Sequence, residues 1–133
     1  VKLRHLENWT EARRRLASRY IEKLSGLPLE LPSEAVGRRH VWHLFVALHP
    51  ERDRIRRELE SEGIQTGLHY PVPVHLQEAY RDLGHAPGDF PIAERIAAEG
   101  FSLPLFPEMT LVQQDRVVDT IRRVLGQDCE ARS

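Results

Sequence analysis

The segment TGLHYPVPVHLQ, residues 66–77, constrains this chain more than any other stretch of its sequence. Pro71 and Pro73 fix their own φ angles, and each keeps the residue before it out of the helical region. His69 and Tyr70 are therefore predicted to stand on stiff, extended backbone where a strand ends. Such backbone has little conformational entropy left to lose, so side chains carried on it are well placed to hold a ligand.

Three segments are predicted as strands. Residues 40–48 carry apolar side chains on both faces, which is typical of a central strand that is covered on each side. Residues 64–70 form the second strand and lead into the prolines. Residues 100–105 form the third, so we expect a small sheet of about three strands.

Helices are predicted on either side of each strand. Residues 1–24 carry leucines and a tyrosine at helical spacing, and no capping residue precedes Val1, so we expect this helix to begin upstream. Pro50 suits the first turn of a second helix, and Gly63 suits its left-handed end. A short helix is predicted over residues 75–83.

Two further helices follow. Asp89 is predicted to cap a helix over residues 90–99. Thr110 and Gln113 form a capping box ahead of the last helix, which Gly126 should end. Residues 127–133 are expected to be a flexible tail. Helices packed on a small sheet define an α+β fold.

Composition excludes several classes of function. The chain has 133 residues, 41% of them hydrophobic and 29% charged, and a net charge of −1. These values are ordinary for one soluble domain, and they give no global attraction to nucleic acid or to anionic lipid. No apolar run is long enough to span a bilayer, and Cys129 is the single cysteine. We therefore expect a cytoplasmic protein that has neither nucleic acid nor membrane as a partner.

Several segments together resemble the DegT/StrS family of pyridoxal-phosphate aminotransferases, which act mainly on nucleotide-linked keto-sugars. The specific segments are HYPVPVHLQ and SLPLFPEMT, and the long first helix, HVWHLFVAL and GDFPIAERIAAEG follow the family in the same order. The resemblance implies the C-terminal small domain of a fold-type I enzyme. Residues 1–26 would link to an absent large domain, residues 27–126 would form the α+β small domain, and residues 127–133 the tail.

The resemblance also implies a function for the parent enzyme. Pyridoxal phosphate would carry an amino group, usually from glutamate, to a keto-sugar attached to a nucleotide. The large domain and a second subunit would complete the active site. This chemistry needs a lysine amine, and Lys2 and Lys23 are the only lysines here. Neither lies in family sequence context, so we expect the chain alone to be inactive, with no catalytic, cofactor-binding or metal-binding residue.

His69 and Tyr70 match family positions implicated in sugar-nucleotide binding. His69 would donate or accept a hydrogen bond to the sugar or phosphate, and Tyr70 would supply a hydroxyl group and an aromatic wall. The alternatives are a strand-end histidine satisfied by backbone and a tyrosine packed in the core. His75 and Gln77 are expected to brace the short helix.

Other readings carry less weight. His69, His75 and Glu78 match no established zinc spacing. Ser102 lacks the glycines of a nucleophile elbow and is expected to be a locally bonded strand serine. The main alternative function is a non-catalytic module that keeps the domain's shape for ligand binding or assembly. An unrelated metal-dependent enzyme is the third possibility.

Overall fold

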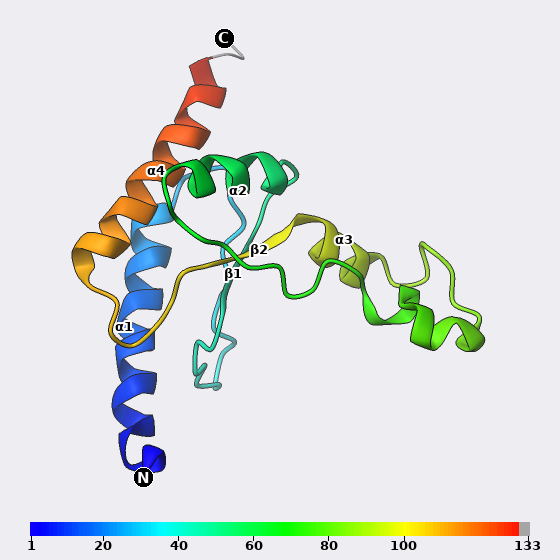
Figure 1. Ribbon diagram of the computed structural model, residues 1–133, viewed down its shortest axis with the longest axis horizontal. Coiled ribbons are helices and arrows are strands. Elements are labelled where there is room, and N and C mark those ends of the chain that lie inside the picture. Colours follow the sequence, from blue (N-terminus) through cyan, green and yellow to red (C-terminus); the bar gives the residue numbers. More distant parts are fainter. Residues whose placement is uncertain (131–133) are drawn as a thin grey trace.

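The computed structural model describes the backbone of residues 1–130 and the side chains of residues 1–126. Helices surround a small sheet, and one part of the chain projects from this body as an arm (Figure 1). In chain order the elements are η1 (Lys2–His5), α1 (Leu6–Leu24), β1 (Phe45–Leu48), α2 (Arg52–Ser61), η2 (Val74–Leu76), η3 (Glu78–Leu83), α3 (Pro91–Glu99), β2 (Gly100–Leu103) and α4 (Leu111–Glu130). The α+β class predicted from the sequence is confirmed.

The sheet has two antiparallel strands, β1 and β2, rather than about three. Their register pairs Phe45 with Leu103 at one end and Leu48 with Gly100 at the other. Two isolated bridges extend the pairing: Glu30 to Leu48, and Gly67 to Ser102.

Local backbone geometry explains why the predicted strands are shorter or missing. The strand predicted over residues 40–48 begins only at Phe45, because Trp42 has a φ of 51° and turns the chain just before it. The strand predicted over residues 64–70 forms only the bridge at Gly67. Its first residue, Ile64, instead donates its N–H to the Leu59 carbonyl over 2.9 Å and so closes α2 after the left-handed Gly63.

The helix ends follow the predictions in part. The capping box is confirmed: the Thr110 N–H donates to Gln113 Oε1 over 2.9 Å, and the Gln113 N–H donates to Thr110 Oγ1 over 3.2 Å. The end predicted at Gly126 is wrong, because α4 continues to Glu130. Residues 127–130 of the expected tail are thus helical, and residues 131–133 lie outside the described part.

The predicted first and third helices also differ from the structure. Residues 2–5 form the short 3-10 helix η1 ahead of α1, so the α-helix begins at Leu6. The short helix predicted over residues 75–83 is divided into the two 3-10 helices η2 and η3, and the left-handed Gly84, with φ of 74°, ends the second.

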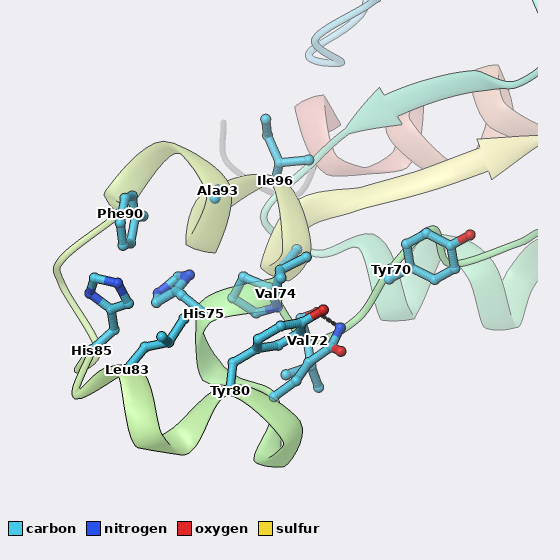
Figure 2. A pocket seen from close by; sticks show the side chains of 13 residues that line it. Tyr70, Val72, Val74, His75, Tyr80, Leu83, His85, Phe90, Ala93 and Ile96 are labelled. Atoms are coloured by element: carbon cyan, nitrogen blue, oxygen red, sulfur yellow. Dashed lines mark hydrogen bonds between the residues drawn. The ribbon is translucent and has the colours of Figure 1, made fainter.

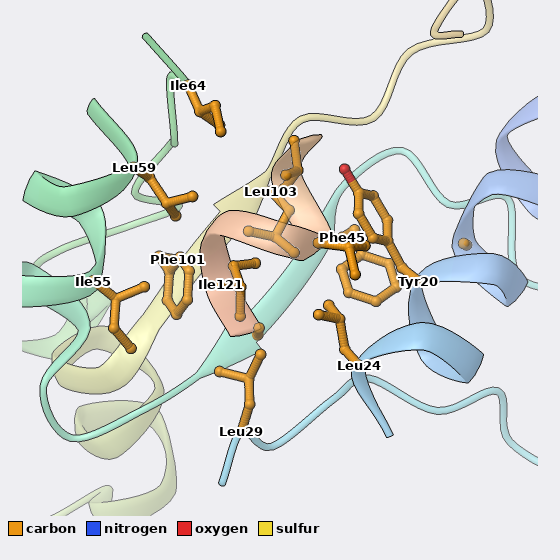
Figure 3. Packing of buried hydrophobic residues seen from close by; sticks show 14 of the residues in the cluster. Tyr20, Leu24, Leu29, Phe45, Ile55, Leu59, Ile64, Phe101, Leu103 and Ile121 are labelled. Atoms are coloured by element: carbon orange, nitrogen blue, oxygen red, sulfur yellow. The ribbon is translucent and has the colours of Figure 1, made fainter. Parts of the chain in front are cut away.

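The hydrophobic core lies where α1, α2 and α4 meet the sheet (Figure 3). Tyr20 of α1 and Phe45 of β1 are fully buried, with ring centroids 5.0 Å apart. The Tyr20 hydroxyl donates to the Pro104 carbonyl over 3.0 Å, and burial raises the pKa of Tyr20. Across the helices, the buried Gln114 amide donates to the Leu16 carbonyl over 2.7 Å. The first helix is therefore part of the same core as the rest of the chain.

The arm contains η2, η3 and α3, and it buries less of its apolar surface than the body does. It extends away from α1 and α4 in Figure 1. Many of its large apolar side chains are exposed, among them Val74, Leu83 and Ile92. Among the described residues, no helix combines the length and the apolar character needed to cross a membrane.

Substitutions at two isoleucines test whether the body contributes more than the arm to the free energy of unfolding. We expect Ile121→Ala, at a fully buried position in α4, to lower the free energy of unfolding by about 2–5 kcal/mol because it leaves a cavity. The matched control Ile92→Ala, at a position 77% exposed in α3, should change it by less than about 0.5 kcal/mol. Urea unfolding followed by circular dichroism measures both. Equal losses would contradict this placement of the core.

Candidate functional site

His69 is exposed and lies two residues after Gly67, which forms a bridge with Ser102. The Gly67 N–H donates to the Ser102 carbonyl over 3.1 Å, and the Ser102 N–H donates to the Gly67 carbonyl over 2.8 Å. Nδ1 of the His69 imidazole lies 2.9 Å from Ser102 Oγ. Within the described part of the chain Nε2 has no hydrogen-bond partner. One ring nitrogen is thus held by the fold, and the other can meet a ligand.

Tyr70 does not pack into the core. Its side chain is 74% exposed, and its ring meets the His69 ring edge-on with centroids 5.8 Å apart. Tyr70 borders the apolar pocket of the arm (Figure 2). The two residues singled out from the sequence are therefore adjacent and exposed, and Tyr70 also lines the pocket.

The pocket lies between the proline-rich segment, η3 and α3, and has a volume of about 580 Å³. Figure 2 places the rings of His75, His85 and Phe90 together on one side of it. Its other lining includes Val72, Val74, Tyr80, Leu83 and Ile96. With so many apolar side chains and few polar ones, this cavity suits an apolar or aromatic group more than an isolated charge.

Glu94 of α3 contacts several parts of the arm through its carboxylate. Its carboxylate accepts hydrogen bonds from the Gly88 N–H over 2.8 Å and the Phe90 N–H over 3.2 Å. Nε2 of His75, a side chain only 9% exposed, lies 3.1 Å from the same carboxylate. The Gly88 amide is the main reason that the pKa of Glu94 lies below its usual value, and the Phe90 amide and His75 act in the same direction.

The prediction that Asp89 caps α3 is wrong. The helix has Phe90 at its N-cap position, and Asp89 Oδ2 instead accepts a hydrogen bond from the Ala86 N–H over 3.0 Å. His85 Nδ1 lies 3.3 Å from the same oxygen. Asp89 therefore closes the turn before the helix, and Glu94 satisfies the backbone at the helix start.

The prediction that His75 and Gln77 brace the short helix is wrong, because neither η2 nor η3 has a side-chain capping bond and both side chains bond elsewhere. His75 reaches across to α3, and the Gln77 side-chain amide donates to the Val72 carbonyl over 3.4 Å. Ser102 lies in a strand, as expected, but the expectation of a local bond is wrong, because its hydroxyl group pairs with His69. Its bond to His69 was not predicted, because 33 residues separate them and only the strand register brings them together.

Glu94 was also missed. A carboxylate in the first turn of a helix is a recognisable signal for satisfying free N–H groups, but Asp89 carried the same signal closer to the helix start. The choice between them depends on the turn at residues 86–89, which local sequence preferences leave open.

Neither lysine lies at this site. Lys23 of α1 pairs with Asp115 of α4 over 3.0 Å, and Lys2 lies in η1 at the far end of the first helix from the arm (Figure 1). Among residues 1–126, no three His, Cys, Asp or Glu side chains are grouped so that they could hold a metal ion. The residues at the site can donate and accept hydrogen bonds and can stack on a ring.

The DegT/DnrJ/EryC1/StrS aminotransferase family model matches residues 1–122. Among curated relatives, the erythromycin biosynthesis sensory transduction protein EryC1 of Saccharopolyspora erythraea is 44% identical over 92% of this chain and 34% of its own length. The dTDP-3-amino-3,4,6-trideoxy-alpha-D-glucose transaminase of Streptomyces venezuelae is 42% identical over 92% of this chain and 32% of its own length.

A solved structure is similar to this chain in both sequence and fold. The crystal structure of S. venezuelae DesV, in complex with a ketimine intermediate, superposes with a TM-score of 0.90 and 41% identity. The match covers 92% of this chain and 33% of DesV. The chain thus spans about a third of the length of the proteins it matches.

The Glu94 contacts predict how the arm responds to acid. The folded state holds the pKa of this carboxyl below its usual value. The ionised carboxylate therefore contributes its full stabilisation of the fold when the pH is above the pKa that Glu94 has in the unfolded chain. This stabilisation is lost as the pH falls through the pKa that Glu94 has in the folded chain. In the NMR spectrum of the native chain, the Gly88 and Phe90 amide protons should titrate together with an apparent pKa below 4.5, the ordinary value for glutamate. In Glu94→Gln this titration should disappear, and the amides of the arm should exchange faster.

The control for this experiment is Glu78→Gln, which changes an exposed carboxylate of η3 that contacts Arg81. It should leave the two amide titrations unchanged. Gly88 and Phe90 amides that titrate at or above the ordinary glutamate value would contradict the assignment of Glu94 as their partner.

Proposed function

The chain belongs to the DegT/DnrJ/EryC1/StrS aminotransferase family, and on that premise we propose that it is the C-terminal part of a sugar-nucleotide aminotransferase. The whole enzyme would move an amino group from an amino acid, glutamate in our proposal, to a nucleotide-linked keto-sugar. The observation that carries the proposal is the match over residues 1–122 to proteins about three times as long. The name of the S. venezuelae relative, a transaminase of a dTDP-sugar, supports this substrate class.

His69 and Tyr70 are the residues of this chain that we assign to the substrate. A nucleotide sugar offers hydroxyl groups, phosphate oxygens and flat or puckered rings. The unpartnered ring nitrogen of His69 is suited to one of these oxygens, and the exposed Tyr70 adds a phenol group and an aromatic face. Both lie directly before the stiff proline segment, so little order is lost when a ligand binds.

The remaining machinery would come from other parts of the enzyme. Pyridoxal phosphate supplies the site that accepts and releases the amino group when it is bound to the whole enzyme. Neither lysine of this chain suits that role, because Lys23 is paired with Asp115 and Lys2 lies in η1, at the end of the first helix away from the arm. We therefore infer that residues 1–26 lead to a large domain that holds the cofactor. A second subunit would complete the site.

Substitutions at the two site residues test their role in the complete enzyme. We expect His69→Ala to raise the KM for the nucleotide sugar about 10-fold or more, because a hydrogen bond to a charged or polar substrate oxygen is lost. Tyr70→Phe should raise it by about 3- to 10-fold. The half-reaction with the amino donor should keep its rate in both variants, since the donor does not carry the nucleotide sugar. Steady-state and single-turnover kinetics measure these effects separately.

His43→Ala is a suitable control for that comparison, because His43 is exposed and lies outside the pocket. Its KM should match that of the unaltered enzyme. An unchanged KM for the nucleotide sugar in both His69→Ala and Tyr70→Phe would overturn the assignment.

The isolated chain provides a separate test of where the cofactor is held. Mixed with pyridoxal phosphate and then treated with borohydride, it should gain no more label at Lys2 or Lys23 than the urea-unfolded chain does. Mass spectrometry of the digested protein reads the label. Selective labelling of either lysine in the folded chain would contradict the inference that the cofactor lysine lies elsewhere.

A further inference from the structure

Ser102 is held more firmly than a serine on a single strand edge. It lies in β2, where every residue is buried, and its own exposed fraction is 5%. On one side β2 pairs with β1, and Val46 faces Ser102 in the register. On the other side two backbone hydrogen bonds join it to Gly67. The hydroxyl group is therefore carried on backbone that is fixed from both edges.

Gly67 is the second residue that lies against the His69 ring, and together Gly67 and Ser102 form what we call the imidazole seat. A Cβ atom placed on Gly67 would lie 2.5 Å from Cε1 and 3.1 Å from Nδ1 of that ring. The imidazole therefore lies directly against the glycine, and any side chain at this position would displace it. The ring can reach Ser102 Oγ only because residue 67 has no side chain.

The direction of the hydrogen bond follows from the surroundings of the hydroxyl group. In the described part of the chain, Nδ1 of His69 is the one side-chain partner of Ser102 Oγ. If the hydroxyl group only accepted a proton from Nδ1, its own buried O–H would have no acceptor, which costs about 1–3 kcal/mol. Donation from Oγ to Nδ1 avoids this cost. In the neutral imidazole the proton then resides on Nε2, the nitrogen that has no hydrogen-bond partner in the described part of the chain.

We propose that Ser102 is a positioning residue that, with Gly67, fixes the orientation and tautomer of His69, so that His69 presents an Nε2–H donor to an acceptor oxygen of the nucleotide sugar. The inference rests on the proposed function in assigning His69 to the substrate, and it adds that His69 donates. Ser102 itself does not touch the substrate. Its effect passes through the imidazole, as a hydrogen-bonded partner fixes the tautomer of a metal-bound histidine.

The tautomer is measured first, in the unaltered chain. Nitrogen-15 NMR of the neutral His69 ring, at a pH high enough to deprotonate imidazole, should give the spectrum of the Nε2–H form. Ser102→Ala should shift the ring to a mixture of the two forms, whereas Ser102→Thr, which keeps a hydroxyl group, should restore the Nε2–H form. A His69 ring with its proton on Nδ1 in the unaltered chain would overturn the proposal without any variant.

Kinetics of the complete enzyme then test whether the imidazole seat affects binding of the nucleotide sugar. Ser102→Ala and Gly67→Ala should each raise the KM for the nucleotide sugar by about 3- to 10-fold while the amino-donor half-reaction keeps its rate. Gly67→Ala moves the ring while the Ser102 hydroxyl group is retained, so it tests the seat independently. Ser61→Ala is the matched control, because that hydroxyl group donates to the Glu58 carbonyl on α2. It should change neither the His69 spectrum nor the KM.

Two outcomes separate this inference from the proposed function. If His69→Ala raises the KM but Ser102→Ala changes neither the tautomer nor the KM, the positioning role is overturned and the substrate role of His69 stands. If Ser102→Ala changes the tautomer as expected but neither it nor His69→Ala changes the KM, the assignment of His69 to the substrate is overturned, and with it the part of the proposal that concerns binding.

Discussion

The pairing of β2 on both of its edges is the constraint on which the rest of the structure depends. Phe101 and Leu103 point into the core, and Ser102 between them reaches His69. Side chains alternate along a strand, so a slip of one residue would move Ser102 into the core and a phenylalanine toward the imidazole. The same register also brings Gly67 beside Ser102. Core packing and site geometry are therefore set by one alignment of a four-residue strand.

Body and arm are stabilised by different interactions. In the body, apolar side chains from three helices and the sheet form a continuous core, and polar bonds such as that from Gln114 to Leu16 are buried within it. The arm has few buried side chains and is held by Glu94, which gathers two backbone amides and His75. Its apolar pocket is open to solvent in this chain.

Much of the fold followed from local patterns. The capping box at Thr110 and the left-handed turn at Gly63 operate over a few residues, and each was found where it was predicted. The helical spacing of apolar residues located the main helices, although several of their ends differ from the prediction. The strands were less predictable, because Trp42 turns the chain and the N–H of Ile64 closes a helix. Asp89 and Glu94 offered equivalent carboxylates to the start of α3, and only the path of the preceding turn decided between them.

By itself, the sequence determined the α+β class, the family and the stiff segment that carries His69 and Tyr70, since these depend on short-range patterns and on the order of motifs. Tertiary structure alone decided that Tyr70 is exposed and that Ser102 and Gly67 hold the imidazole. The reason is physical: a hydrogen bond between residues 33 positions apart exists only after strand register and burial bring them together, and no local preference of either residue encodes that meeting.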